Sequence, residues 1–392
     1  MPKQTKADWP TALIAAAANL LPSMVVATLG IALPEVRQTL LLSEIEAGGL
    51  FSVIFVVAAV SSAVAGRLAD KIGRKTVLLI GISTVSVGFA LAGLSRAYPL
   101  MLVLLAITGL GYGFTTPSLY ALMSDLVPAR KGLGASLVSV AYAIGGSLGA
   151  IVSSAIIART GWRAAFLTAG AFGIMITAVE MIGVRVVFKK RPTDLGRSFP
   201  RALNRSVIVL ALAEFFGGSV FWSSASWTPT VLRTVKELSL RETGLVMGVW
   251  ALTPMVGGIL LGGLSDRVGR RVVILWSAFP AAAIAYVVYE WLASLGSLAI
   301  GFGLFGFLKA TAPTLIIALA QESAAADSAG TTSGIILSMH YAAAVVAPLV
   351  AAQLIASTGD MILTMVLTAA LPLVVYGCLI ATIKEKRAAG AA

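Results

Sequence analysis

Residues 66–75 have the sequence G-R-L-A-D-K-I-G-R-K, and residues 262–271 have the sequence G-G-L-S-D-R-V-G-R-R. Both segments follow the pattern G-x-L-x-D-x-x-G-R-[KR], and the second begins 196 residues after the first. Since 196 is half of the 392 residues, this period predicts a chain built from two tandem copies of one structural unit.

The composition is that of a membrane protein. The sequence is 58% hydrophobic and 12% charged, whereas soluble domains carry about 25% charged residues. Apolar runs of roughly 20 residues recur from Trp9 to the C-terminus, and each is long enough to cross a bilayer core about 30 Å thick. Roughly twelve such runs are present by this criterion, and we expect the first to be retained as a helix.

The net charge of +12 reflects membrane topology. Most of the 29 Lys and Arg residues fall in loops on one side of the predicted spans, which places both termini in the cytoplasm. We therefore expect a multi-pass protein of the cell membrane, with the lipid bilayer and not nucleic acid as its partner. The single cysteine, Cys378, excludes an intrachain disulfide and a C-x-x-C metal or redox site.

The repeat extends beyond the Gly-Asp segments and sets the expected domains. A capping box at residues 43–46 (S-E-I-E) has a counterpart 196 residues later at 239–242 (S-L-R-E). The predicted organisation is an N-terminal six-helix bundle over residues 1–188, a basic cytoplasmic linker over 189–203 and a C-terminal six-helix bundle over 204–392.

The repeated pattern strongly resembles the loop between the second and third helices of the major facilitator superfamily of membrane transporters. The resemblance covers the whole chain. It implies an all-α membrane protein with 12 transmembrane helices in two pseudo-symmetric bundles, with helices one, four, seven and ten around a central cavity. It also implies a transporter, expected to be a monomer without a cofactor, and not an enzyme.

The resemblance further implies that charges near the repeated loops hold the cytoplasmic face shut. Arg74 would pair with Asp125 and Arg270 with Glu322, while Asp70 and Asp266 would face helix starts in the opposite half, where the helix dipole stabilises a carboxylate. The alternative is that these charges only set topology. The residues expected to act in gating are Asp70, Arg74, Asp125, Asp266, Arg270, Glu322, Gly66, Gly73, Gly262 and Gly269.

Two corresponding spans are interrupted by glycine and proline, at residues 109–117 and 301–313. Such paired interruptions point to a transport site near mid-membrane. Lys309 replaces Gly113 in this register, so the duplicated halves differ there by a charge. Asn19, near Pro22 in the first span, lies in a similarly weakened helix.

Glu214 and Lys309 are expected to face the cavity at similar depth. A charge at the bilayer centre costs at least about 2.5 kcal/mol and usually marks a substrate or ion pathway. Lys309 would attract an anionic substrate, with Glu214 as its resting partner and proton carrier; alternatively, the two form a static pair. The candidate substrate- and proton-binding residues are Lys309, Glu214, His340, Tyr112, Thr115, Thr311, Trp222, Phe305 and Asn19.

Two further ionisable positions have structural alternatives. His340, the only histidine, either titrates in the site or packs against its neighbours. Glu180 and Arg185 lie toward the cytoplasmic end of the sixth span, where a structural pair or snorkelling accounts for both.

These features predict a secondary active transporter that moves a small organic anion, such as a carboxylate metabolite, together with protons by alternating access. A proton-coupled multidrug exporter is the main alternative, but the arginine expected in its fourth span falls at Leu105, and the acid of its first helix is absent. A passive uniporter and a non-transporting membrane sensor are the remaining alternatives.

Overall fold

The computed structural model describes residues 8–127, 131–185, 204–310, 314–323 and 329–383, and no β-strand occurs among them. The helices of the first half are α1 (Trp9–Ala17), α2 (Leu20–Leu40), α3 (Glu44–Ile72), α4 (Arg74–Ala92), α5 (Tyr98–Leu126), α6 (Lys131–Thr160) and α7 (Trp162–Gly183). Those of the second half are α9 (Arg205–Thr234), α10 (Leu240–Val268), α11 (Arg270–Glu290), α12 (Leu295–Lys309), α13 (Thr314–Ser323), α14 (Ala329–Thr358), α15 (Met361–Met365), the π-helical turn η3 (Val366–Ala370) and α16 (Leu371–Ala381).

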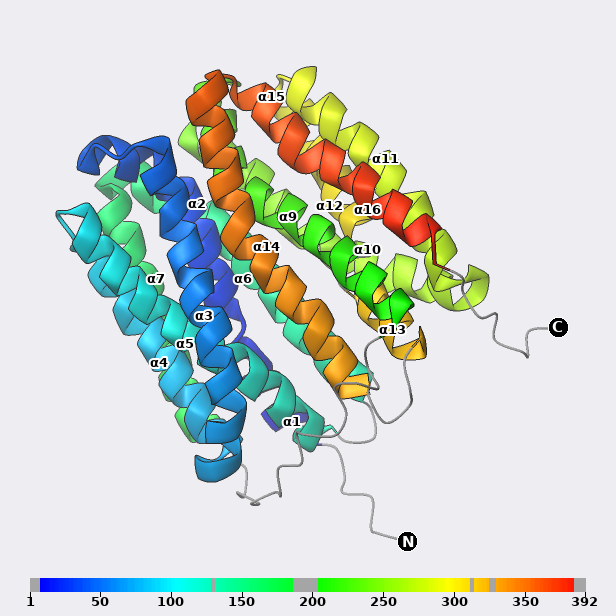
Figure 1. Ribbon diagram of the computed structural model, residues 1–392. Coiled ribbons are helices and arrows are strands. Elements are labelled where there is room, and N and C mark those ends of the chain that lie inside the picture. The colour runs from blue at the N-terminus through cyan, green and yellow to red at the C-terminus, as the bar shows by residue number, and fades with distance from the viewer. Residues whose placement is uncertain (1–7, 128–130, 186–203, 311–313, 324–328, 384–392) are drawn as a thin grey trace, which may run out of the picture.

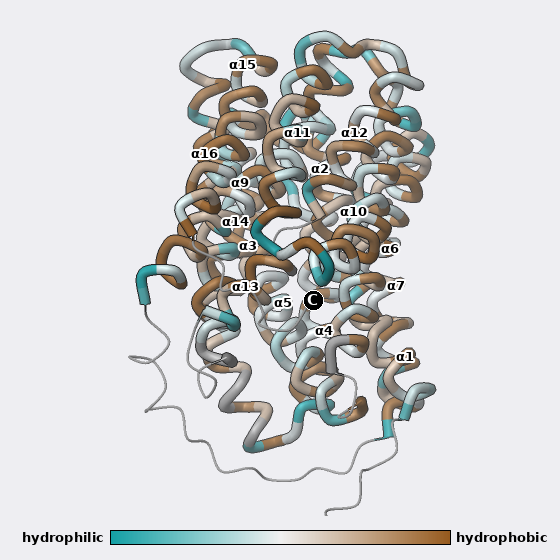
Figure 2. Tube along the Cα trace, turned by 90° about the vertical axis from the view of Figure 1, so that its right-hand side faces the viewer, coloured by the Kyte–Doolittle hydropathy of each residue, from teal (hydrophilic) through white to brown (hydrophobic). Residues whose placement is uncertain are grey.

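The predicted helical membrane fold is confirmed. In the described chain, eleven helical segments are long and apolar enough to cross a membrane, with α1 and α2 counted as one, and α12 is a shorter apolar helix. The two halves form two bundles, with α4, α5 and α7 on one side and α11 and α16 on the other (Figure 1). Hydrophobic residues run along the helices and many of the hydrophilic ones lie near their ends (Figure 2). The predicted linker, 189–203, lies outside the described residues.

Both predicted capping boxes are present. The Ser43 hydroxyl accepts from the Glu46 amide, while the Glu46 carboxylate accepts from the Ser43 amide at the start of α3. Ser239 and Glu242 make the same reciprocal bonds at the start of α10. These bonds satisfy amide groups that a helix start otherwise leaves unpaired, so equivalent sequences begin equivalent helices in the two halves.

The second glycine of each repeated motif makes the turn between two spans. Gly73, between α3 and α4, has φ 97°, and Gly269, between α10 and α11, has φ 100°. L side chains rarely adopt such values, so the backbone itself requires glycine at both positions. We call the end of the bundles that carries these two turns the motif face, and the other end the opposite face.

The first span is broken. Helix α1 ends at Ala17 and α2 begins at Leu20, with a turn over Ala18 and Asn19. Pro22 explains the position, because proline has no amide hydrogen to donate to the carbonyl four residues earlier. The corresponding span of the second half, α9, is continuous.

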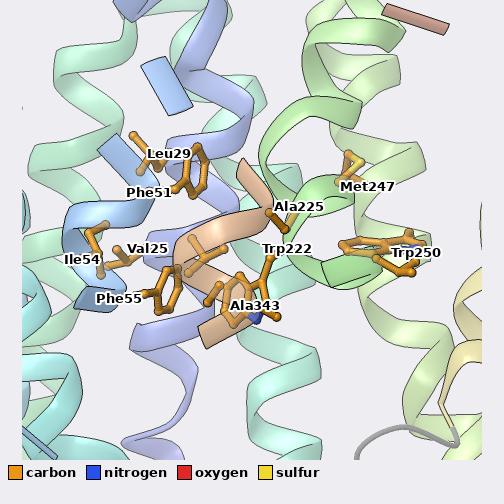
Figure 3. Packing of buried hydrophobic residues seen from close by; sticks show 14 of the residues in the cluster. Val25, Leu29, Phe51, Ile54, Phe55, Trp222, Ala225, Met247, Trp250 and Ala343 are labelled. Atoms are coloured by element: carbon orange, nitrogen blue, oxygen red, sulfur yellow. The ribbon is translucent and has the colours of Figure 1, made fainter. Parts of the chain in front are cut away.

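The halves meet at small residues. A Cβ on Gly30 of α2 would lie 2.5 Å from the Ala225 carbonyl oxygen of α9, and one on Gly48 of α3 would lie 2.8 Å from the Pro348 carbonyl oxygen of α14. Apolar residues from α2, α3, α9, α10 and α14 pack together in this region (Figure 3). Backbone contact of this kind favours close helix packing in a membrane.

Glycine also allows close packing within the first half. A Cβ on Gly109 of α5 would lie 2.3 Å from the Ile54 carbonyl oxygen of α3, whereas one on Gly258 of α10 would meet nothing within 4 Å. We expect Gly109→Ala to destabilise the protein by about 1–3 kcal/mol, because α3 and α5 must move apart. Gly258→Ala is the matched control and should leave the thermal unfolding temperature unchanged or raise it. Equal unfolding temperatures for the two variants would contradict this assignment.

Candidate functional site

A buried carboxylate contacts the only histidine of the chain. Glu214 of α9 is 0% exposed, and its Oε1 lies 2.8 Å from Nδ1 of His340 in α14. Gly218, one turn further along α9, lies so close to α14 that a Cβ there would be 3.1 Å from the same Nδ1. The missing side chain at Gly218 brings α14 close, so His340 is the hydrogen-bond partner of Glu214, while Lys309 interacts with Glu214 as a nearby charge.

Lys309 lies against an aromatic ring. It is the last residue of α12 and is 9% exposed, and its Nζ lies 4.9 Å from the centre of the Phe221 ring of α9. A cation over a ring face is attracted by the ring quadrupole, the more so where water is scarce. No ion pair joins Lys309 to another described residue.

The register explains why only the second half carries this charge. At Gly113, the counterpart of Lys309, a Cβ would lie 2.1 Å from the Ser61 hydroxyl and 2.4 Å from the Ala58 carbonyl oxygen. Helix α3 therefore leaves no room for a side chain in the first half. In the second half, α12 ends at Lys309, and its side chain reaches Phe221.

Aromatic rings surround Phe221 and link the two halves. Phe221 stacks on Trp250 of α10 with 5.3 Å between ring centres and meets Trp222 edge-on at 4.9 Å. Trp222 in turn contacts Phe55 of α3 at 4.1 Å, and Phe55 contacts Tyr112 of α5 at 5.5 Å. Figure 3 shows Phe55 and Trp222 facing each other across the contact between the halves.

Several buried polar atoms in this region have no hydrogen-bond partner among the described residues. They are Oε2 of Glu214 and the indole N–H groups of Trp222 and Trp250. An unpaired buried donor or acceptor is costly, so such atoms usually serve a ligand, an ordered water or a proton. The region therefore offers one acceptor, two neutral donors and the Lys309 ammonium.

Other candidate residues lie elsewhere. Thr115 donates to the Gly111 carbonyl of its own helix and faces Gly81 of α4. The ring contact of Phe305 is with Phe302, inside the second half. Asn19 donates to the Val138 carbonyl of α6 at 2.9 Å and lies in the turn between α1 and α2. Thr311 lies outside the described residues.

The sequence interpretation missed three residues. Phe221 lies seven residues after Glu214, and this spacing on one helix face could have identified it. Phe55 and Trp250 come from other spans, and nothing in their local sequence separates them from ordinary apolar packing residues.

The chain matches a family of known transporters. The family profile described as Major Facilitator Superfamily matches residues 15–348 and 210–388. This chain belongs to that superfamily. It is therefore a multi-pass membrane transporter and not an enzyme, as the sequence predicted.

Curated relatives include transporters of different compounds. A gallate transporter of Pseudomonas putida is 26% identical over 344 residues, which cover 75% of this chain and 74% of the relative. Multidrug resistance protein MdtL of Shewanella sp. (strain ANA-3) is 25% identical over 317 residues, which cover 78% and 80%.

Among solved structures, a bacterial homolog of the human lysosomal transporter Spinster, in an inward-facing and occupied conformation, superposes with a TM-score of 0.81. The match covers 95% of both chains at 16% identity, so it shows the shared fold.

At the motif face of the transporter, two ion pairs between described residues each lie within one half. Arg74 of α4 pairs with Asp125 of α5 at 2.7 Å and also donates to the Ala121 carbonyl. Arg270 of α11 pairs with Glu322 of α13 at 2.7 Å. Both pairings expected from the family resemblance are present.

The helix starts that the two motif aspartates are expected to face, those of α6 and α14, lie partly outside the described residues. Asp266 is 69% exposed and lies 3.7 Å from Arg270 of its own half. The side chain of Asp70 is not among those described. Gly262 lies in α10 with no atom near its Cβ position, and Gly66 lies in α3.

At the opposite face an ion pair joins the two halves. Arg233 of α9 donates to Glu35 of α2, and both side chains are about three-quarters buried. Arg37 and Glu44 form a second pair, but within the first half. Together with the Gly48 contact, the Glu35–Arg233 pair holds α2 and α3 against α9 and α14 at this face.

Loss of the Glu35–Arg233 pair should favour opening at the opposite face. Ser52, 5% exposed, donates to the Val345 carbonyl of the other half and becomes accessible only when the halves separate there. The test uses a protein with Cys378→Ser and Ser52→Cys, so that the cysteine introduced at position 52 is the thiol that reacts with an impermeant maleimide. We expect Arg233→Gln to make this reaction about fivefold faster, which corresponds to a shift of about 1 kcal/mol toward the open state.

Arg37→Gln is the matched control, since it breaks an ion pair of similar burial within one half. It should leave the reaction rate unchanged. Equal acceleration by both substitutions would show that the pair between the halves has no particular role in closing this face.

Proposed function

We propose that this protein is a secondary active transporter that moves a small organic anion together with a proton by alternating access. The observation that carries the proposal is a group of ionisable side chains among apolar helices: Lys309 and Glu214 are buried, and His340, 17% exposed, contacts Glu214. Ionisable residues inside a membrane protein usually mark a substrate or ion pathway.

Lys309 is proposed to bind the anionic group of the substrate. Its ammonium is buried and lies against the Phe221 ring, and it interacts with Glu214 only at longer range, so a substrate anion would not have to displace a direct ion pair there. The nearby indole N–H groups of Trp222 and Trp250 supply further donors for the same anion.

The Glu214–His340 pair is proposed to carry the proton. With Glu214 ionised, His340 neutral and Lys309 charged, the site as a whole is neutral. Entry of a monovalent anion would then bury a net negative charge, which is costly in an apolar interior. Binding of one proton by the Glu214–His340 pair restores neutrality, so the burial cost itself couples one proton to one anion.

The aromatic residues are proposed to contact the body of the substrate. Phe221 contacts Lys309 and Trp222 contacts the His340 ring, while Tyr112 lies beyond Phe55 in the first half, and such rings suit a flat, apolar body. The name of the Pseudomonas putida relative agrees with such a substrate, because gallate is an aromatic carboxylate.

The ion pairs favour a rocking movement of the two halves. Contacts between the halves lie toward the opposite face, while the described ion pairs of the motif face stay within each half. We infer a state open toward the motif face, which the positive-inside rule assigns to the cytoplasm.

A drug exporter is the second candidate, supported by the apolar rings and by the name of the MdtL relative. A buried lysine disfavours cationic drugs, since its charge repels them. A proton flux assay separates the two functions.

We expect inward gradients of gallate or another aromatic carboxylate to acidify liposomes that contain the protein and a pH-sensitive dye. Lys309→Gln should raise KM at least about tenfold, the equivalent of about 1.4 kcal/mol, because it removes the anion-binding charge. Lys309→Arg is the matched control and should retain most of the affinity. Glu214→Gln should abolish acidification while anion exchange persists.

A panel of sugar acids, aliphatic carboxylates and the lipophilic cation tetraphenylphosphonium completes the experiment. Proton movement with the cation alone, unaffected by Lys309→Gln, would overturn anion symport in favour of export. Anion flux without acidification in the wild type would show a uniporter.

A further inference from the structure

A second buried carboxyl group lies in the first half, away from the site described above. Glu180 of α7 is 1% exposed, and neither of its carboxyl oxygens has a hydrogen-bond partner among the described residues. The sequence suggested a structural pair with Arg185 or snorkelling to the membrane surface. Glu180 is buried, which argues against snorkelling to the membrane surface. The described side chains of Glu180 and Arg185 form no ion pair.

Glycines on α7 place Glu180 against the broken first span. A Cβ on Gly173 would lie 2.6 Å from Leu21, and one on Gly183 would lie 2.9 Å from Ile14. Glu180 lies between these two contacts and next to the amide of Ala18. That amide already donates to the Ala15 carbonyl at 3.2 Å, so it offers the carboxylate little compensation.

The position that Glu180 touches has a counterpart in the second half. Ala18 lies 196 residues before Glu214, the repeat length of the chain. Each half therefore places a buried carboxyl group at the same level of its first span. In the second half the carboxyl group is that of Glu214, in the first span itself. In the first half it is that of Glu180, which lies on α7 and reaches the first span across the helix interface.

The charged groups around Glu180 are few. On α4, Lys75 donates to the Met181 carbonyl at 2.8 Å, which places its ammonium beside Glu180 on the motif-face side. On α1, Asp8 is engaged with Thr11 at the start of the helix. No charged side chain of the described parts of α2 and α6 contacts Glu180.

We propose that Glu180 is a proton-binding site of the first half. An ionised carboxylate is costly in this apolar position, because its one neighbouring donor, the Ala18 amide, is already bonded to the Ala15 carbonyl, and binding of a proton removes the charge. Glu180 lies three residues before the end of α7, so the proton has a short path past Lys75 to water at the motif face. Movement at the Ala18–Asn19 turn changes what surrounds the carboxyl group and so controls uptake and release of the proton.

Infrared difference spectroscopy on the full-length protein in lipid nanodiscs tests this site. A pH step should produce a C=O stretching signal from carboxyl groups that become protonated. Glu180→Gln should remove one component of this signal, and Glu214→Gln should remove a different component. The measurement needs no substrate, so it stands even if anion transport fails in liposomes, and the inference does not depend on the proposed function.

Two results would overturn the proposal. One is a pH-dependent carboxyl signal that Glu180→Gln leaves unchanged, and the other is a Glu180 signal present at every pH, which would make the residue a permanently protonated packing group. If Glu180→Gln does not fold, Glu180→Asp keeps the carboxyl group, and its signal should shift in frequency but still respond to pH. Thr177→Val, on the same helix, is the control and should leave the signal unaltered.

Discussion

Hydrocarbon offers no hydrogen bonds, and this constraint governs the architecture. Each backbone group within the bilayer must find its partner inside the protein, which restricts a polytopic chain of this kind to helices. Breaks in a helix are then tolerable only where the surrounding protein takes up the freed groups. The break at Ala18–Asn19 satisfies this condition, because the Asn19 amide bonds to α6 and α7 packs closely against both sides of the break.

The same constraint makes the few buried ionisable residues of this chain notable. Lys309, Glu214, His340 and Glu180 are each buried or nearly so in helices that otherwise present apolar and small side chains. Their surroundings differ: a ring face for Lys309, an imidazole for Glu214, and for Glu180 an Ala18 amide that is already bonded within its own helix turn.

Much of the fold could be predicted from the sequence because its signals are local or periodic. The apolar runs, the two capping boxes and the glycine turns at Gly73 and Gly269 depend on neighbouring residues and on the repeat. The partners of Glu214 and Glu180 depend on which helix faces overlap, and single-residue details such as the missing side chain of Gly218 decide that. Spacing along one span predicts that Glu214 and Lys309 lie at similar depth, but it cannot reveal that His340 makes the hydrogen bond to Glu214.

The end of α12 has a further consequence for Lys309. The peptide dipoles of a helix leave partial negative charge at its C-terminus, and a cation placed there is stabilised. Lys309 is the last residue of α12, so its ammonium lies at the end where these dipoles favour positive charge. The helix end therefore adds a fixed attraction to those that the Phe221 ring and the nearby Glu214 carboxylate exert on the Lys309 ammonium.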